Sequence, residues 1–162
     1  MVKSIILIAL NLTVFISGVF LDMRVASDTS CWIVGPTSTG GNAIIHDRIS
    51  GWKTDLVDAN WIWDINLNTT PGFGVVTKYF YIAGIVNSGI LRIAADNRFT
   101  TYLNNVNANC ISISDNTFNL VDGVFCDVKS YLKSGLNTLV ISVENISGDA
   151  GVIFKLEVTS NY

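Results

Sequence analysis

The sequence predicts an all-β protein that folds as an antiparallel two-sheet β-sandwich. Two segments near the C-terminus, 138–145 and 151–159, alternate apolar side chains with others over most of their length. One face of the first carries Leu139, Ile141 and Val143, and one face of the second carries Val152, Phe154, Leu156 and Val158. A period of two over this length is typical of strands with one buried face. No long segment follows the 3.6-residue period of a helix, so we expect both layers of the fold to be sheets.

Shorter apolar runs, separated by Gly, Asn, Asp and Ser, predict the remaining strands. They lie at residues 32–34, 43–46, 61–67, 75–85, 90–95, 99–103, 111–113 and 124–128. The breaks carry turn chemistry, as in Asn104-Asn105, because asparagine tolerates the left-handed conformation that tight turns require. Residues 127–133 are predicted to form a single helical turn, and Gly135 then permits the reversal into the next strand.

Length and composition fit one packed domain. The chain has 162 residues, of which 49% are hydrophobic and only 14% are charged. This length suffices for a two-sheet core without metals or a lattice of disulfides. The net charge of −3 argues against a nucleic-acid partner, because phosphate backbones attract basic surfaces.

The N-terminal segment has the order of a secretory signal. A basic residue precedes a predominantly apolar stretch at residues 5–21. Small residues suited to cleavage occur at Gly18 and again at 25–27, so we divide the chain into a leader, residues 1–27, and a domain, residues 28–162. An uncleaved signal anchor is the alternative, because the apolar stretch lies at the short limit for spanning a bilayer. The segment predicts a secreted, extracellular protein, with membrane contact only if it stays uncleaved.

Three cysteines are an odd number for a chain bound for an oxidising compartment. We expect Cys110 and Cys126 to form a disulfide, because they lie in a region of adjacent strands separated by 15 residues. Cys31 is then either a buried free thiol or a cross-link between subunits. The triplets that begin at Asn68 and Asn145 are N-glycosylation sequons.

The chain carries no recognisable catalytic constellation, so we expect it not to be an enzyme. His46 is the only histidine, and no Gly-x-Ser-x-Gly nucleophile motif accompanies it. The Gly-rich stretch 35–41 lacks the lysine and the following hydroxyl of a phosphate-binding loop, and reads as a surface loop. The histidine and cysteines lack the paired spacing of a zinc site. No cofactor is expected; a structural calcium ion held by Asp55, Asp58 and Asp64 is the alternative.

Several short signatures resemble the galactose-binding-domain-like jelly roll, a β-sandwich module found in lectins and as an accessory domain of glycosidases. They are Trp61-Ile-Trp63, the segment 78–82, Ala95-Asp-Asn97, Tyr102-Leu-Asn104, the segment 131–137, and Asn145 with Gly148 and Ala150-Gly151. The resemblance extends from Trp61 to Val158 and implies a jelly-roll β-sandwich, here preceded by an N-terminal hydrophobic signal segment. It also implies a non-enzymatic module that binds carbohydrate at its end loops.

A carbohydrate site requires an aromatic platform and polar side chains, because a sugar ring offers an apolar C–H face and a rim of hydroxyl groups. Trp52 is the preferred platform, since Trp61 and Trp63 are expected in the core. The candidate ligand-binding residues around it are His46, Arg48, Asn97 and Arg98. Further aromatic candidates, if they face outward, are Trp32, Tyr79, Tyr81 and Tyr102. The expected partners are glycans or glycoproteins.

A second hypothesis is a self-associating structural subunit of an extracellular filament, coat or matrix. It rests on the low charge, on the odd cysteine and on the lack of a recognisable second domain. An exposed edge strand or an apolar N-terminal arm would supply the contact by strand addition. This hypothesis predicts a homo-oligomer or polymer that needs no ligand.

Overall fold

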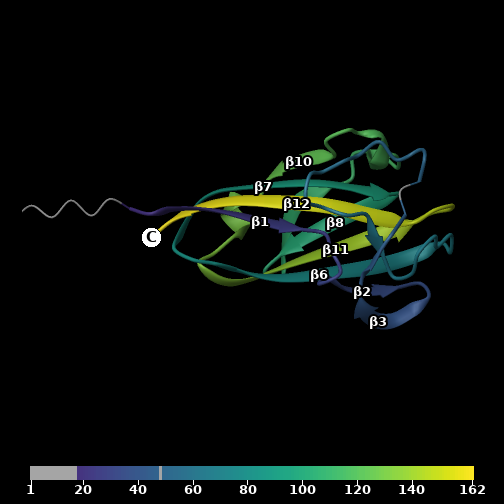
Figure 1. Ribbon diagram of the computed structural model, residues 1–162, viewed down its shortest axis with the longest axis horizontal. Coiled ribbons are helices and arrows are strands. Elements are labelled where there is room, and N and C mark those ends of the chain that lie inside the picture. The colour runs from purple at the N-terminus through teal and green to yellow at the C-terminus, as the bar shows by residue number, and fades with distance from the viewer. Residues whose placement is uncertain (1–17, 48) are drawn as a thin grey trace, which may run out of the picture.

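The computed structural model describes residues 18–47 and 49–162, which form two antiparallel sheets packed face to face, as predicted (Figure 1). The first sheet contains, in spatial order, β10 (Val124–Asp127), β7 (Ile85–Asp96), β12 (Gly151–Asn161), β5 (Ile62–Trp63) and β4 (Ile44–Ile45), and β1 (Phe20–Ala26) also pairs with β12. The second sheet contains β3 (Ser38–Asn42), β2 (Trp32–Gly35), β6 (Gly72–Ile82), β11 (Gly135–Asn145), β8 (Arg98–Leu103) and β9 (Val106–Ile111). Two short 3₁₀ turns, η1 (Thr117–Asn119) and η2 (Lys129–Tyr131), complete the described elements.

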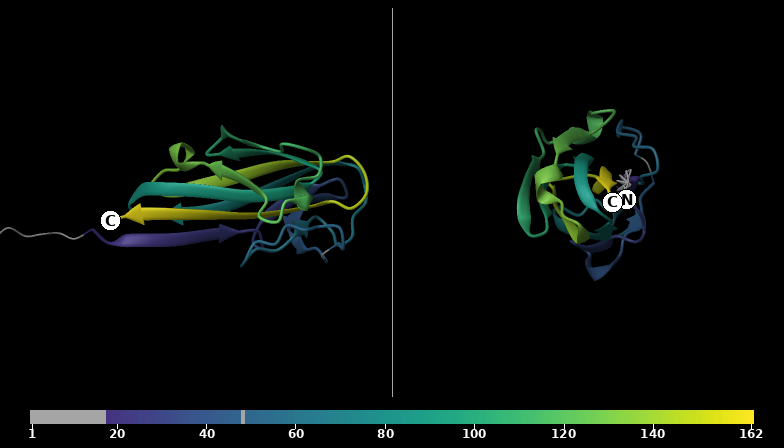
Figure 2. Two further views of the ribbon diagram at one scale, coloured as in Figure 1. Left: turned by 90° about the horizontal axis from the view of Figure 1, so that it is seen from above. Right: turned by 90° about the vertical axis from the view of Figure 1, so that its left-hand side faces the viewer.

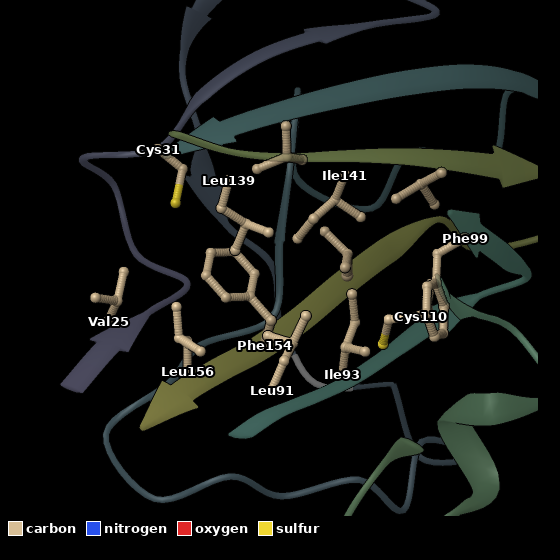
Figure 3. Packing of buried hydrophobic residues seen from close by; sticks show 14 of the residues in the cluster. Val25, Cys31, Leu91, Ile93, Phe99, Cys110, Leu139, Ile141, Phe154 and Leu156 are labelled. Carbon is tan, nitrogen blue, oxygen red and sulfur yellow. The ribbon is translucent and has the colours of Figure 1, made fainter. Parts of the chain in front are cut away.

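The two sheets bury the faces that the alternation predicts. Leu139 and Ile141 of β11 are fully buried, and so are Phe154 and Leu156 of β12. Figure 3 shows these side chains facing one another across the space between the sheets. Each fully buried Leu, Ile or Phe side chain contributes about 1.5–3 kcal/mol of hydrophobic stabilisation. This core therefore holds the sandwich together and leaves the outer faces available for function.

The strands near residue 110 and in the Gly-rich stretch differ from the sequence prediction. β9 occupies Val106–Ile111, whereas the sequence predicts a strand at 111–113. Asn104 and Asn105 both have positive φ, 52° and 67°, so the chain turns directly from β8 into β9. β3 overlaps the stretch 35–41, for which the sequence predicts a loop, because pairing with β2 uses the backbone and needs no apolar side chains.

β1, the first described strand of the chain, adds to the first sheet by pairing with β12. Its residues pair with β12 in continuous register, from Phe20 opposite Asn161 to Ala26 opposite Lys155. The sheet thus includes residues 20–26, which were assigned above to the leader. The apolar residues up to 17 lie outside the described part of the chain. Within that part, no helix has the length and apolar character needed to cross a membrane.

A second, smaller hydrophobic cluster covers part of the outer face of the first sheet. Ala94 of β7 and Ile153 of β12 point outward, yet both are almost fully buried. The segment between β4 and β5 folds over them and supplies Trp52, Leu56 and Trp61. This cover explains how a stretch without strand or helix periodicity becomes part of the protein interior.

The disulfide joins the two sheets at one side of the sandwich. Cys110 lies on β9 of the second sheet and Cys126 on β10 of the first, and the two form the pair favoured by the sequence. Cys31 is free and fully buried in the main core. Its position matches the buried-thiol alternative, because a cross-link to another subunit needs an accessible sulfur.

Candidate functional site

Trp52, the sugar platform preferred from the sequence, is not on the surface. Its side chain is only 3% exposed, and its ring lies 4.1 Å, centroid to centroid, from the ring of Trp61. Its indole Nε1 donates a 2.8 Å hydrogen bond to Oδ2 of Asp96. Gly151 makes room for the ring, because a Cβ at that position would lie 2.6 Å from it. The prediction of Trp52 as a binding platform is therefore wrong, because packing on the outside of the first sheet consumes the ring.

His46 is also buried and its two ring nitrogens are occupied. Nε2 accepts a 3.0 Å hydrogen bond from the backbone N–H of Leu67, and Nδ1 lies 2.8 Å from the carbonyl oxygen of Asp47. This pattern assigns the proton to Nδ1 of a neutral imidazole, which donates to Asp47. The imidazole packs 5.2 Å from the Trp52 ring, centroid to centroid, and is only 3% exposed, so it is unavailable to a ligand. Arg48 lies outside the described residues.

The Asn97 side chain bonds to the backbone at Ile146 and Asp115 and so fixes neighbouring turns. Arg98 lies on the outer face of the second sheet. The Asn97 side chain accepts a 2.8 Å hydrogen bond from the N–H of Ile146 and donates to the carbonyl of Asp115. Arg98 is exposed and pairs with Asp115 and, at 3.6 Å, with Glu144. The structure therefore brings His46 and Trp52 together in the interior and leaves Arg98 accessible, on the outer face of the second sheet.

Asp96 is an ionisable group in an unusual environment within this closed region. The pKa of its carboxyl is raised to about 6, mainly by burial and in smaller part by the nearby Asp149, while the hydrogen bond from Trp52 opposes the shift. Asp96 is only 8% exposed and its Oδ2 accepts a hydrogen bond from the Trp52 indole. The carboxyl therefore fixes the covering segment in place and is not accessible to a ligand.

The outer face of the second sheet carries a set of exposed aromatic side chains. Tyr79 and Tyr81 of β6 are 64% and 67% exposed, Phe73 of the same strand is 64% exposed, and Trp32 of β2 is 49% exposed. Tyr102 of β8 is half-buried on the same side. We call this surface the aromatic face; it comprises Trp32, Phe73, Tyr79, Tyr81 and Tyr102, with Val34, Val75, Leu136 and Val140 between them.

Strand register places these side chains in rows across the sheet. Thr77 of β6 lies opposite both Trp32 and Val140, and Val140 lies opposite Tyr102. This row therefore crosses four strands and has an aromatic ring at each end. Tyr79 and Tyr81 lie on the same side of the row, about 7 Å apart along β6. Side chains two residues apart on a strand point the same way, and the exposure of both rings shows that this side is the outer face.

Polar groups lie at the far end of the aromatic face. A shallow depression of about 200 Å³ is lined there by Phe73, Arg98, Phe99, Thr100, Ile111, Ser112, Ser142 and Glu144. Register places Glu144 between Phe73 on one neighbouring strand and Arg98 on the other. The hydrogen bond that Arg98 donates to the Asp115 carboxylate holds the pKa of the guanidinium above its usual value, so Arg98 stays a donor. The depression thus combines an aromatic ring with donors and acceptors suited to hydroxyl groups.

A groove of about 430 Å³ on the outer face of the first sheet is less suited to a sugar. It is lined by β1, β7, β10 and β12, and its exposed aromatic residue is Phe125. The guanidinium of Arg92 lies 5.3 Å from the centre of the Phe125 ring and also binds Glu157 at 2.8 Å. Arg92 covers one face of that ring, and its side chain is 28% exposed against 50% for that of Arg98, so these groups are less accessible to a ligand.

The sequon asparagines are engaged inside the fold, whereas two of the suggested calcium ligands, Asp55 and Asp58, are exposed. Asn68 and Asn145 are only 3% and 2% exposed, and both side-chain amides donate internal hydrogen bonds, for example to Asp64 and Thr70. A glycan cannot be attached to either amide while these bonds are intact. Asp58 pairs with Arg24, and nowhere among residues 18–47 and 49–162 do three potential metal ligands gather.

The alternation of β6 indicates the aromatic face in the sequence, whereas the resemblance implies a site at the end loops. In the stretch 73–82, residues Phe73, Val75, Tyr79 and Tyr81 share one side, and Val76, Phe80 and Ile82 share the other. Both sides are apolar, so periodicity alone does not say which one is buried. The structure settles this by packing Val76 and Ile82 against the first sheet.

Comparison with known proteins supports the fold. No protein-family model matches the chain, and neither does any curated protein. Among solved structures it is similar to a Streptomyces avermitilis α-L-rhamnosidase complexed with L-rhamnose, with a TM-score of 0.53 and 19% identity over 85% of this chain and 12% of that one. It is also similar to a putative β-galactosidase from Bacteroides fragilis, with a TM-score of 0.51 and 13% identity over 83% of this chain and 23% of that one.

A β-glucuronidase from Ruminococcus gnavus gives a further match, with a TM-score of 0.50 and 14% identity over 83% of this chain and 29% of that one. All three proteins are carbohydrate-active enzymes by name, and this chain spans less than a third of the length of each. At these identities the matches establish a shared β-sandwich fold, which forms one part of larger enzymes.

Proposed function

We propose that this protein is a secreted carbohydrate-binding module without catalytic activity of its own, and that it binds through the aromatic face. The observation that carries the proposal is the exposure of Trp32, Tyr79 and Tyr81 on one side of one sheet. Aromatic rings of this kind stack on the apolar faces of sugar rings, and their burial on binding supplies most of the affinity.

Polar side chains on the same face would orient a bound sugar through hydrogen bonds to its hydroxyl groups. Thr77, Thr138 and Ser142 lie between the aromatic residues, and Arg98 with Glu144 closes one end. Hydroxyl groups act as both donors and acceptors, and charged groups form the stronger hydrogen bonds. Because the face is open and crosses several strands, it suits a stretch of glycan chain better than a single enclosed sugar.

The likeness to parts of carbohydrate-active enzymes supports a role of this class, and so does the resemblance to galactose-binding-like modules. Those modules are expected to bind at their end loops, whereas the corresponding residues here, His46 and Trp52, are buried. The proposal therefore moves the site from the loops to the sheet. It keeps Arg98, the described member of the predicted set that is exposed.

Docking to another protein is the alternative use of this face. Val34, Val75 and Leu136 lie among the aromatic residues and are 41%, 38% and 60% exposed. Contiguous apolar surface of this extent is typical of interaction sites. A structural subunit of an extracellular assembly would use such a face to bind its neighbour rather than a sugar.

A glycan screen with matched variants tests the proposal. The protein, secreted from the full chain, is assayed against a panel of soluble and immobilised glycans. Tyr79→Ala/Tyr81→Ala is expected to weaken binding about tenfold or more, since two stacking contacts are lost. Phe125→Ala is the control, because it removes a similarly exposed ring from the opposite sheet. Failure of the folded protein to bind any glycan would contradict the proposal and favour protein docking.

A further inference from the structure

We propose that β1 pairs with β1 of a second copy of this chain, antiparallel and about a twofold axis at Met23. The contact would join the first sheets of two molecules into one continuous sheet. It lies on a different sheet from the aromatic face and does not depend on the proposed carbohydrate binding.

β1 is a regular strand with one partner. All seven of its residues pair with β12 without a shift in register. Figure 2 shows β1 along the outside of the sandwich, with β12 on one side of it and no strand on the other. A strand in this position presents unpaired backbone N–H and C=O groups, which are ready to pair with another chain.

The other edge strands are interrupted or short. The pairings of β9 with β8 and of β3 with β2 both shift in register, and Asn109 and Gly40 have positive φ. Such irregularities twist an edge and protect it from pairing. β4 has two residues and β10 has four. Among the described strands, β1 therefore offers the longest regular edge.

The outward side chains of β1 are complementary to themselves. In antiparallel pairing centred on Met23, Asp22 of one copy lies opposite Arg24 of the other, and the twofold axis repeats this pair. Phe20, which is 76% exposed, lies opposite Ala26. Residues directly opposite on one face of an antiparallel pair have Cβ atoms about 5 Å apart, so each carboxylate meets a guanidinium. Pairing in other registers would lose this match.

Both charged residues are available for the contact. The backbone of Asp22 pairs with β12, but its carboxylate has no hydrogen-bond or ion-pair partner among the described residues. Arg24 pairs with Asp58 at 3.2 Å, but the two side chains are 65% and 60% exposed. Exposed pairs of this kind contribute little, so Arg24 can exchange Asp58 for Asp22 of the partner at small cost. The inward residues are compatible as well, because Leu21 would face Val25 of the second copy.

Charge reversal with rescue is the sharpest test. Sedimentation velocity over a range of protein concentrations should show a reversible monomer–dimer equilibrium for the protein secreted from the full chain. Asp22→Arg and Arg24→Asp each place like charges opposite one another and should weaken dimerisation about tenfold or more. Asp22→Arg/Arg24→Asp restores the opposite charges and should restore the dimer. A mixture of the two single variants should form heterodimers, because one carries two cations and the other two anions at these positions.

The controls separate this contact from others. Asp58→Asn removes the present partner of Arg24 and should leave dimerisation unchanged or slightly stronger. Tyr79→Ala/Tyr81→Ala should dimerise like the wild type even if glycan binding is lost, so the two proposals fail independently. The inference is overturned if the protein stays monomeric, if the single variants dimerise normally, or if the double variant is not rescued. A mass spectrum of the secreted protein lacking residues 18–26 would overturn it too.

Discussion

The indole Nε1 of Trp52 donates a 2.8 Å hydrogen bond to Oδ2 of Asp96, and both residues are buried. This bond fixes the segment between β4 and β5 against the outer face of the first sheet. It closes the region where the sequence suggested a sugar site. The second sheet, which has no such cover on its aromatic face, is left as the candidate binding surface.

The Trp52 ring should act on stability rather than on binding. Trp52→Ala is expected to lower the free energy of unfolding by about 3–5 kcal/mol, as for other buried large-to-small changes. Trp32→Ala, at a side chain that is 49% exposed, should cost less than about 1 kcal/mol. Urea denaturation of both variants measures the difference, and similar losses for the two would contradict the assignment of buried and exposed tryptophans.

Asp96 should make stability depend on pH in an unusual direction. Its pKa in the folded state is about 6, above the reference value of 3.8. The folded state therefore binds the proton more tightly, so this contribution is present below about pH 4 and is lost as pH rises through about 6. The loss is at most about 3 kcal/mol.

Asp96→Asn isolates this contribution, because the amide oxygen still accepts from Trp52 but does not titrate. The free energy of unfolding of the wild type, minus that of the variant, should fall between pH 4 and pH 7. Taking the difference removes carboxyls with lowered pKa values, such as Asp28 and Glu157, which act in the opposite sense. A difference that stays constant or rises with pH would disprove the prediction.

Reduction of the disulfide should lower the free energy of unfolding but leave the sandwich folded. Cys110 and Cys126 are 16 positions apart, and closing a loop of this size restricts the unfolded chain by about 3 kcal/mol. The midpoint of urea denaturation should fall in the presence of a reductant. Cys110→Ala/Cys126→Ala should be insensitive to the reductant, and an unchanged wild-type midpoint would contradict the prediction.

Cys31 should be unreactive in the folded protein. Burial raises the pKa of its thiol and removes it from solvent, and both effects slow reaction with a disulfide reagent. Labelling should proceed only as fast as the protein unfolds and should accelerate sharply in urea. Rapid labelling in native buffer, or a dimer cross-linked through this residue, would show that the sulfur is accessible.

The strands with one clearly polar face were predictable from the sequence. Alternation in β11 identified Leu139 and Ile141 as core residues, and Asn104-Asn105 identified the turn between β8 and β9. These predictions depend on local chemistry that operates within a few residues. The inward face of β12 follows in the same way, through Phe154 and Leu156.

The location of the candidate site was not predictable in the same way, because it depends on what covers each sheet. Ile153 alternates as an outward residue, yet the segment carrying Trp52 folds over it and buries both. Tyr79 and Tyr81 lie on a strand whose two faces are both apolar, so only the packing of the opposite sheet reveals which face is free. β1 was not predicted because its first residues belong to the apolar stretch that has the pattern of a leader.

An NMR titration of the ¹⁵N-labelled protein with a glycan selected in the screen would locate the binding surface residue by residue. The largest shift changes should fall on the aromatic face, at the Trp32 indole and at the amides of Thr77, Tyr79 and Tyr81. Shift changes confined to the end loops near Trp52 and Asn97, or to the groove beside Phe125, would contradict binding through this face.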